Sequence, residues 1–194
     1  MAQVDQIEEA LQRLMGDVSP EVREAASEAF DAVRARRSVA GLLQELRTGS
    51  VEARIRAVYS GGQIGGQEGL GLLMAALDDA DAEVRAVAAR ELSVFPAVPV
   101  LKAIVERLPK ERGIVLGNLI ETLGRSRRKE LAPVVERYLA DPDPFVKGKA
   151  LVAYARTADA PWPRLVQAAV DGNDTVRAAA AQALGEWSEI AAAR

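Results

Sequence analysis

The sequence predicts an all-α solenoid of about six helical hairpins, and two observations indicate it. The first is a period of 31 residues in a column of aliphatic side chains, whose last member is one residue short: Val22, Ala53, Val84, Val115, Val146 and Val176. The second is a composition that is 49% apolar but only 4% aromatic, with no alternating β-branched run that would predict a strand. A fixed period of this length is typical of repeat proteins, in which each unit buries its apolar face against the next.

Other columns keep the same phase as the aliphatic one. The next position is mainly basic: Arg23, Arg54, Arg85, Leu116, Lys147 and Arg177. The position four residues after the aliphatic column is small or apolar: Ala26, Ala57, Ala88, Leu119, Ala150 and Ala180. Because several columns share one period across residues 1–194, we expect a single domain made of one continuous array.

Each unit is expected to end in a helix that we call helix B. Apolar residues at the aliphatic column and four and eight residues later lie on one helical face. Three residues before the column stand side chains that favour a helix N-cap: Ser19, Ser50, Asp81, Asp143 and Asn173. Pro20 and Pro144 follow two of these caps, at the first helical position, where a missing N–H costs nothing.

A first helix, helix A, is predicted before each helix B. Its apolar residues recur near the same place in every unit, as in Leu42, Leu43 and Leu46, or Ile104, Val105 and Leu108. The unit is therefore an antiparallel pair of helices joined by a short turn.

Three stretches resemble HEAT repeats, most closely the short class of the phycobilisome-lyase-type HEAT-like proteins. They are DADAEVRAVAAREL (79–92), DPDPFVKGKALVAY (141–154) and GNDTVRAAAAQALG (172–185). The resemblance implies a right-handed α-solenoid. Its known members serve as scaffolds, adaptors, lyases and nucleic-acid enzymes, so the resemblance indicates the fold more strongly than the activity.

In HEAT repeats, acidic and basic columns form a hydrogen-bonded ladder between successive units. The resemblance assigns that role here to Asp17, Asp79, Asp141 and Asp171 with Arg23, Arg54, Arg85, Lys147 and Arg177. Repeat four departs from the pattern, because Lys110 replaces the Asp and Leu116 replaces the Arg. We expect repeat four to lack the contact between the acidic and basic columns and to compensate for it by apolar packing. A bend or a specialised contact at this repeat is the alternative.

The sequence contains no His and no Cys, which removes the commonest general base, the usual zinc ligands and the thiol nucleophile. The His-Glu motifs of metal-dependent HEAT-like hydroxylases cannot exist in this chain. Asp78, Asp79, Asp81 and Glu83 are explained better by helix capping than by catalysis. The glycine-rich stretch 61–71 lacks the Gly-Lys-Ser/Thr ending of a phosphate loop and predicts a helix end and a turn. We expect no enzyme activity and no cofactor.

Two basic clusters are expected in turns between a helix B and the next helix A: Arg34, Arg36 and Arg37, then Arg125, Arg127, Arg128 and Lys129. They are interpreted as solvated helix C-termini, with an acidic or phosphate contact as the alternative. The net charge of −3 makes general nucleic-acid binding improbable, because a basic field is its usual footprint.

Partner binding is expected on the concave face formed by the helices B. Side chains three, six and ten residues after the aliphatic column point away from the core there. The candidate partner-binding residues are Arg56, Tyr59, Arg90, Asn118, Glu121, Arg125, Lys149 and Arg156. Arg and Tyr often anchor interfaces, and the spaced cations favour a protein partner with an acidic surface or segment. The predicted function is therefore a non-catalytic scaffold or adaptor.

Two other functions remain open at this stage. One is an accessory bilin lyase or a chaperone of a chromophore protein, as in phycobilisome-lyase relatives. The other is a HEAT-like DNA glycosylase, which the small number of aromatic residues disfavours. No signal peptide or membrane-spanning run is visible, so a cytoplasmic location is expected, and the Arg- and Ala-rich composition favours a bacterial source. The sparsely charged last helix predicts weak homodimerisation through the C-terminal repeat.

Overall fold

The computed structural model describes the backbone of residues 2–192, and side chains at 5–31, 33 and 37–189. Within these residues every regular element is helical, which confirms the all-α prediction. The chain divides into two compact units, residues 1–72 (unit 1) and 73–194 (unit 2). The expectation that 1–194 forms one continuous array stays a prediction.

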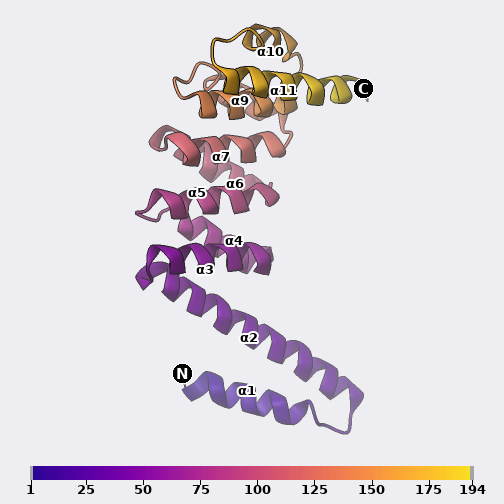
Figure 1. Ribbon diagram of the computed structural model, residues 1–194. Helices are drawn as coiled ribbons and strands as arrows, with labels where there is room; N and C mark the ends of the chain where they lie inside the picture. The colour runs from indigo at the N-terminus through magenta and orange to yellow at the C-terminus, as the bar shows by residue number, and fades with distance from the viewer. Residues whose placement is uncertain (1, 193–194) are drawn as a thin grey trace. The chain divides into compact units, whose positions relative to one another are not determined.

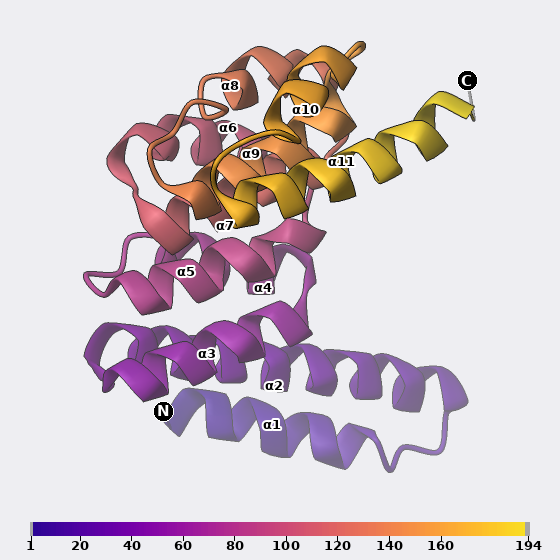
Figure 2. The same cartoon turned by 45° about the horizontal axis from the view of Figure 1, so that its top comes forward.

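Unit 1 is built on a long helical hairpin (Figure 2). Helix α1 (Ala2–Leu14) runs antiparallel to α2 (Pro20–Thr48), and α3 (Val51–Ile64) packs against α2. Helix α4 (Gly66–Ala76) carries the chain from unit 1 into unit 2. Arg37 on α2 forms ion pairs with Asp5 at 2.8 Å and with Glu8 at 3.2 Å, so it fastens α2 to α1.

The turn expected near residues 34–37 does not exist, because α2 is continuous for 29 residues. Residues 30–40 (FDAVRARRSVA) contain no Gly or Pro, so nothing in this segment interrupts the helix. The first basic cluster therefore lies within a helix, and its Arg37 neutralises carboxylates of α1. The side chains of the other two members, Arg34 and Arg36, lie outside the described residues.

The glycine-rich stretch forms the predicted helix end and turn. Gly65 and Gly66 have φ angles of 64° and 55°, in the left-handed region that favours glycine. Gly61 and Gly69 have a different role, since a Cβ on Gly69 would lie 2.2 Å from the Gly61 carbonyl oxygen. These two glycines allow α3 and α4 to approach closely.

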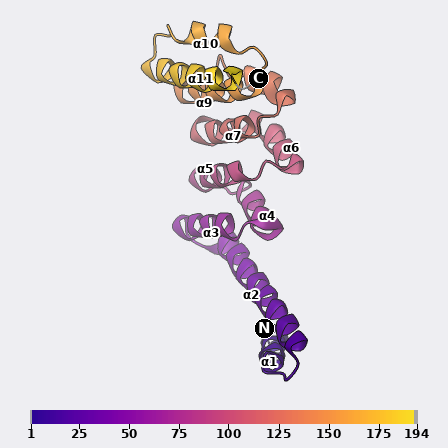
Figure 3. The ribbon, with the colours of Figure 1, turned by 90° about the vertical axis from the view of Figure 1, so that its right-hand side faces the viewer.

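Unit 2 contains two layers of helices, visible in Figures 1 and 3. The helices B are α5 (Ala82–Glu91), α7 (Gly113–Arg125), α9 (Pro144–Thr157) and α11 (Asp174–Ala192). The helices A are α6 (Val98–Arg107), α8 (Ala132–Glu136) and α10 (Trp162–Ala168). Three short 3-10 helices accompany these elements. Helix η1 (Leu92–Val94) follows α5, η2 (Leu108–Lys110) follows α6, and η3 (Lys129–Leu131) precedes α8. Neighbouring helices B make the most extensive contacts, α5 with α7, α7 with α9 and α9 with α11.

Apolar residues that recur with the predicted period are buried in the structure. The column four residues after the aliphatic one is buried in every repeat, from Ala26 to Ala180. The N-caps also form where expected: the side-chain oxygens of Ser50, Asp81 and Asp143 each accept a backbone N–H of the first helical turn. Ser19 is the exception, because its hydroxyl donates to Glu21 instead.

The acidic and basic columns act inside their own turns as well as between successive repeats, so part of the expected ladder is present. Arg23, Arg85 and Arg177 each donate to the backbone carbonyl of the acidic residue six positions earlier. The acidic side chains accept backbone N–H groups two residues later, as Asp79 does from Asp81. Within unit 2, Lys147 forms an ion pair with Asp171 of the next repeat, as the ladder predicts.

Repeat four does not lose its rung, contrary to expectation. Glu111, one residue after the expected acidic position, accepts from Arg85 at 3.1 Å and from Arg107 at 2.9 Å. Its side chain is only 5% exposed, and Arg107 also pairs with Asp78. The acidic partner has therefore moved by one position, and η2 brings it back to Arg85. At the next junction Leu116 is buried and supplies apolar packing in place of the Arg.

Within residues 2–192, no helix combines the length and the apolar character needed to cross a membrane.

Candidate functional site

A groove of about 260 Å³ crosses the helix-B face of unit 2, and we call it the α9 groove. Its residues come from three consecutive helices B: Glu121 from α7; Phe145, Gly148, Lys149, Val152, Ala153 and Arg156 from α9; and Thr175, Ala178, Ala179 and Gln182 from α11. Figures 1 and 2 show α9 and α11 side by side. Its floor is made of small residues, and its rim combines apolar and charged side chains.

The predicted partner-binding residues are distributed unequally around this groove. Glu121, Lys149 and Arg156 line it directly. Arg125 lies one turn after Glu121 on α7 and binds it at 3.0 Å. These four therefore form one connected site.

The other four candidates do not line the groove. Asn118 donates its side-chain amide to the Ala86 carbonyl, so it ties α7 to α5. Arg90 is exposed on α5 and lies 3.6 Å from Glu91. Arg56 and Tyr59 are exposed on α3, in unit 1.

Ion pairs hold the charged side chains along the groove in place. Glu121 accepts from both Lys149 and Arg125, and Arg156 makes a two-pronged contact with Glu186 at 2.7 Å and 2.9 Å. Burial raises the pKa of Glu121, but Lys149 and Arg125 outweigh it, so the pKa lies below its usual value. The hydrogen bond from Arg156 lowers the pKa of Glu186 in the same direction. Both carboxylates are therefore ionised at neutral pH, and the ion pairs weaken only as the pH falls through these lowered values.

Glycines set the shape of the groove. A Cβ on Gly117 would lie 2.4 Å from the Phe145 ring, so this glycine lets the ring rest against α7. A Cβ on Gly148 would lie 3.1 Å from the Cβ of Ala179, which brings α9 close to α11. The amine of Lys149 lies 5.6 Å from the centre of the Phe145 ring, within range of a cation–π interaction.

The sequence analysis missed the α11 side of the groove, although the signal was present. Extending the same three offsets to repeat six gives Ala179, Gln182 and Glu186. The first two line the groove, and the third is the partner of Arg156. Phe145 was missed because it precedes the aliphatic column, and no offset rule includes that position.

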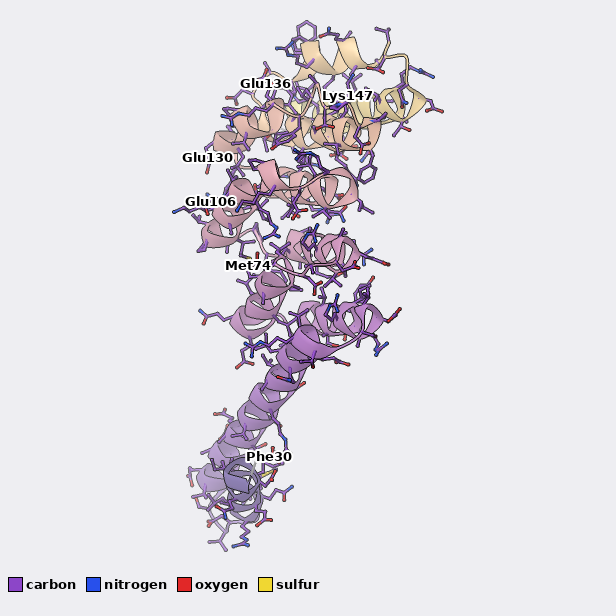
Figure 4. All side chains as sticks on the ribbon, turned by 90° about the vertical axis from the view of Figure 1, so that its left-hand side faces the viewer. Phe30, Met74, Glu106, Glu130, Glu136 and Lys147 are labelled. Carbon is purple, nitrogen blue, oxygen red and sulfur yellow. The ribbon has the colours of Figure 1, made fainter. Side chains whose placement is uncertain are left out.

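A second hollow of about 550 Å³ lies on the helix-A side of unit 2, between α8 and α10. Figure 4 labels Glu136 and Lys147 at this hollow. The first pairs with Arg164 at 3.3 Å, and the second pairs with Asp171, so these charges neutralise one another. A smaller hollow of about 190 Å³ lies between α4 and α6, where Figure 4 labels Met74 and Glu106.

The second basic cluster is also engaged with carboxylates of the chain. Arg128 pairs with Glu130, and Lys129 pairs with Asp159. Arg127 lies close enough to Glu186 to contribute to its lowered pKa. Among the residues whose side chains are described, no three acidic groups are arranged to hold a metal ion. Of the four acids near the start of α5, Asp81 caps the helix as predicted and Asp79 accepts the backbone N–H of Asp81, while Asp78 pairs with Arg107 instead.

Comparisons with solved structures give the fold. Human deoxyhypusine hydroxylase in complex with glycerol is similar over 80% of this chain, with a TM-score of 0.60 and 20% identity. The chain spans 65% of that hydroxylase structure. An engineered protein is similar over 95% of this chain and 97% of its own, with a TM-score of 0.51 and 19% identity. A search of curated proteins found no match.

A sequence profile of HEAT repeats matches residues 39–115 and 98–185, and these two overlapping ranges include well over half of the chain. The match confirms the resemblance drawn from the repeat columns, while the phycobilisome-lyase-type subclass stays a prediction. The chain belongs to the family of HEAT-repeat proteins.

Proposed function

We propose that this protein is a non-catalytic scaffold that binds a partner protein in the α9 groove. The observation that carries the proposal is the lining of the groove, where Phe145 and Val152 lie beside Lys149 and Arg156 over a floor of small residues. Its volume of about 260 Å³ is below the ~300–1,000 Å³ usual for small-molecule pockets. A shallow groove of this kind is suited to side chains presented by another protein.

The proposed partner carries carboxylates. Among the residues whose side chains are described, Glu121 is bonded to Lys149 and Arg125, and Glu186 is bonded to Arg156 and lies near Arg127, so four cations accompany these two carboxylates in the network along the groove. The network therefore keeps a surplus of positive charge that complements an acidic segment.

The non-catalytic part of the proposal rests on the available chemistry. The chain has no His or Cys, and the acids near the groove are bound to Lys or Arg side chains. The hydroxylase activity named for the human structure is not carried over, because 20% identity supports the fold alone.

Filling the groove should abolish partner binding. Ala178→Trp places a large side chain on the exposed floor of the groove, so the partner should lose contact while α11 keeps its fold. The protein is used as bait in its native cell extract, and the captured partner is then purified and its affinity measured by calorimetry. Ala181→Trp is the matched control, since Ala181 is also exposed on α11 but does not line the groove. Equal binding by both variants, with unchanged helical circular dichroism, would contradict the proposal.

A weak homodimer through the C-terminal repeat is the second part of the proposal. Trp162, Val166 and Val170 follow one another at four-residue spacing and are 51%, 51% and 82% exposed. Such a stripe favours contact with a second copy. Sedimentation should show a dimer only at high protein concentration, and Val166→Glu should remove it. A strictly monomeric profile of the unaltered protein would contradict this expectation.

A further inference from the structure

The accessible side chains of α9 follow one line along the groove. Phe145, Lys149, Val152 and Arg156 are separated by four, three and four residues, which is the spacing of a seam that faces another helix. On α11, Thr175, Ala179, Gln182 and Glu186 repeat that spacing. Two parallel seams of equal period therefore border the groove.

The two cations on α9 keep hydrogen-bonding capacity for a ligand. Lys149 has three N–H donors and gives one to Glu121. Arg156 uses Nε and Nη2 for Glu186, and its Nη1 donates to none of the residues whose side chains are described. A partner carboxylate can therefore join each ion pair without displacing the glutamate.

The separation of these cations selects the conformation of the ligand. The backbone positions of Lys149 and Arg156 are seven residues apart on α9, which corresponds to a rise of about 10.5 Å. A helical ligand matches this distance with carboxylates that are also seven residues apart, because two turns return them to the same face. An extended ligand would need about three residues at 3.3 Å each, and that odd number places the carboxylates on opposite faces. An extended ligand with both carboxylates on one face would space them by about 7 or 13 Å, so the helical ligand fits the spacing along α9 better.

We propose that the α9 groove binds an α-helix of the partner, with two carboxylates seven residues apart and small apolar side chains between them. This inference rests on the proposed function and specifies its partner. The carboxylates contact Lys149 and Arg156, and the apolar residues between them contact Val152 and the floor at Ala178.

Synthetic helices test this proposal without knowledge of the natural partner. The probes are alanine-rich peptides of about 16 residues, near the minimum length for a stable helix in water. One has two glutamates seven residues apart, and the other has the same composition with the glutamates five apart, on opposite faces. Fluorescence anisotropy should give about tenfold tighter binding of the first peptide. Lys149→Gln with Arg156→Gln should remove that difference, while Lys102→Gln with Arg137→Gln, at two exposed cations outside the groove, should keep it.

Equal affinity for the two peptides would overturn the helical register. If Ala178→Trp still releases the native partner in that case, the scaffold proposal stands and only the inference fails. If Ala178→Trp leaves the native partner bound, the proposed function fails at this groove, whatever the peptides do.

Discussion

Replacing Glu111 by Ala should lower the free energy of unfolding by about 3 kcal/mol, because it leaves partly buried cations without their carboxylate. Arg85 and Arg107 are only 18% and 21% exposed, and both donate to Glu111. Arg85 would keep its carbonyl acceptors in the turn before α5, and Arg107 would keep Asp78, so each charge stays in place with poorer compensation. The measurement is the shift of the urea midpoint followed by circular dichroism.

Glu106→Ala is the matched control for Glu111→Ala. Glu106 is exposed on α6, one turn before the buried acid, so its removal should change the unfolding free energy by less than about 0.5 kcal/mol. Glu111→Gln should lie between the two variants, since the amide oxygen still accepts one hydrogen bond. Equal midpoints for Glu111→Ala and Glu106→Ala would show that the shifted rung contributes nothing to stability.

Gly124→Ala should be the second strongly destabilising substitution, with a loss of about 2 kcal/mol from overpacking. A Cβ at this position would lie 2.6 Å from both the Cα and the Cβ of Ala153, so α7 and α9 must move apart. The displaced atoms belong to the backbone and to a short side chain, which cannot turn away. The loss should also widen the α9 groove, because Ala153 is part of its lining.

Gly185→Ala should raise the free energy of unfolding instead of lowering it, and it serves as the control. No atom lies within 4 Å of a Cβ at Gly185, inside the exposed part of α11. Alanine should therefore stabilise the helix by about 1 kcal/mol through its higher propensity. A loss in both variants, measured by thermal unfolding, would mean that backbone flexibility and not close contact determines the effect at Gly124.

The repeat columns predicted the helices B because burial obeys the same period. The column from Ala26 to Ala180 is buried in every repeat and is therefore restricted to apolar residues, so the sequence carries this constraint directly. Capping residues such as Asp81 and Asp143 can be predicted equally well, since their hydrogen bonds reach only two residues along the chain.

Features that depend on distant partners could not be predicted in this way. The continuity of α2 was missed because the period required a turn that no Gly or Pro in residues 30–40 provides. The role of Glu111 was missed because it lies one position outside its column, and only η2 brings it to Arg85. The pairing of Arg156 with Glu186 joins equivalent positions of neighbouring repeats, so the repeat offsets place the two residues alike, but the contact itself depends on how α9 packs on α11.

The shifted acid limits how freely the units of this chain can be exchanged by protein engineers. A graft that replaces repeat four with a copy of another repeat would remove Arg107 together with Glu111, so Arg85 would depend on the acid that the graft supplies one position earlier. Repeat six imposes a condition of the same kind, because Lys147 with Asp171 and Arg156 with Glu186 both cross its junction. Shuffled arrays should therefore stay stable where each exchanged hairpin supplies the carboxylates that the cations of the preceding repeat need.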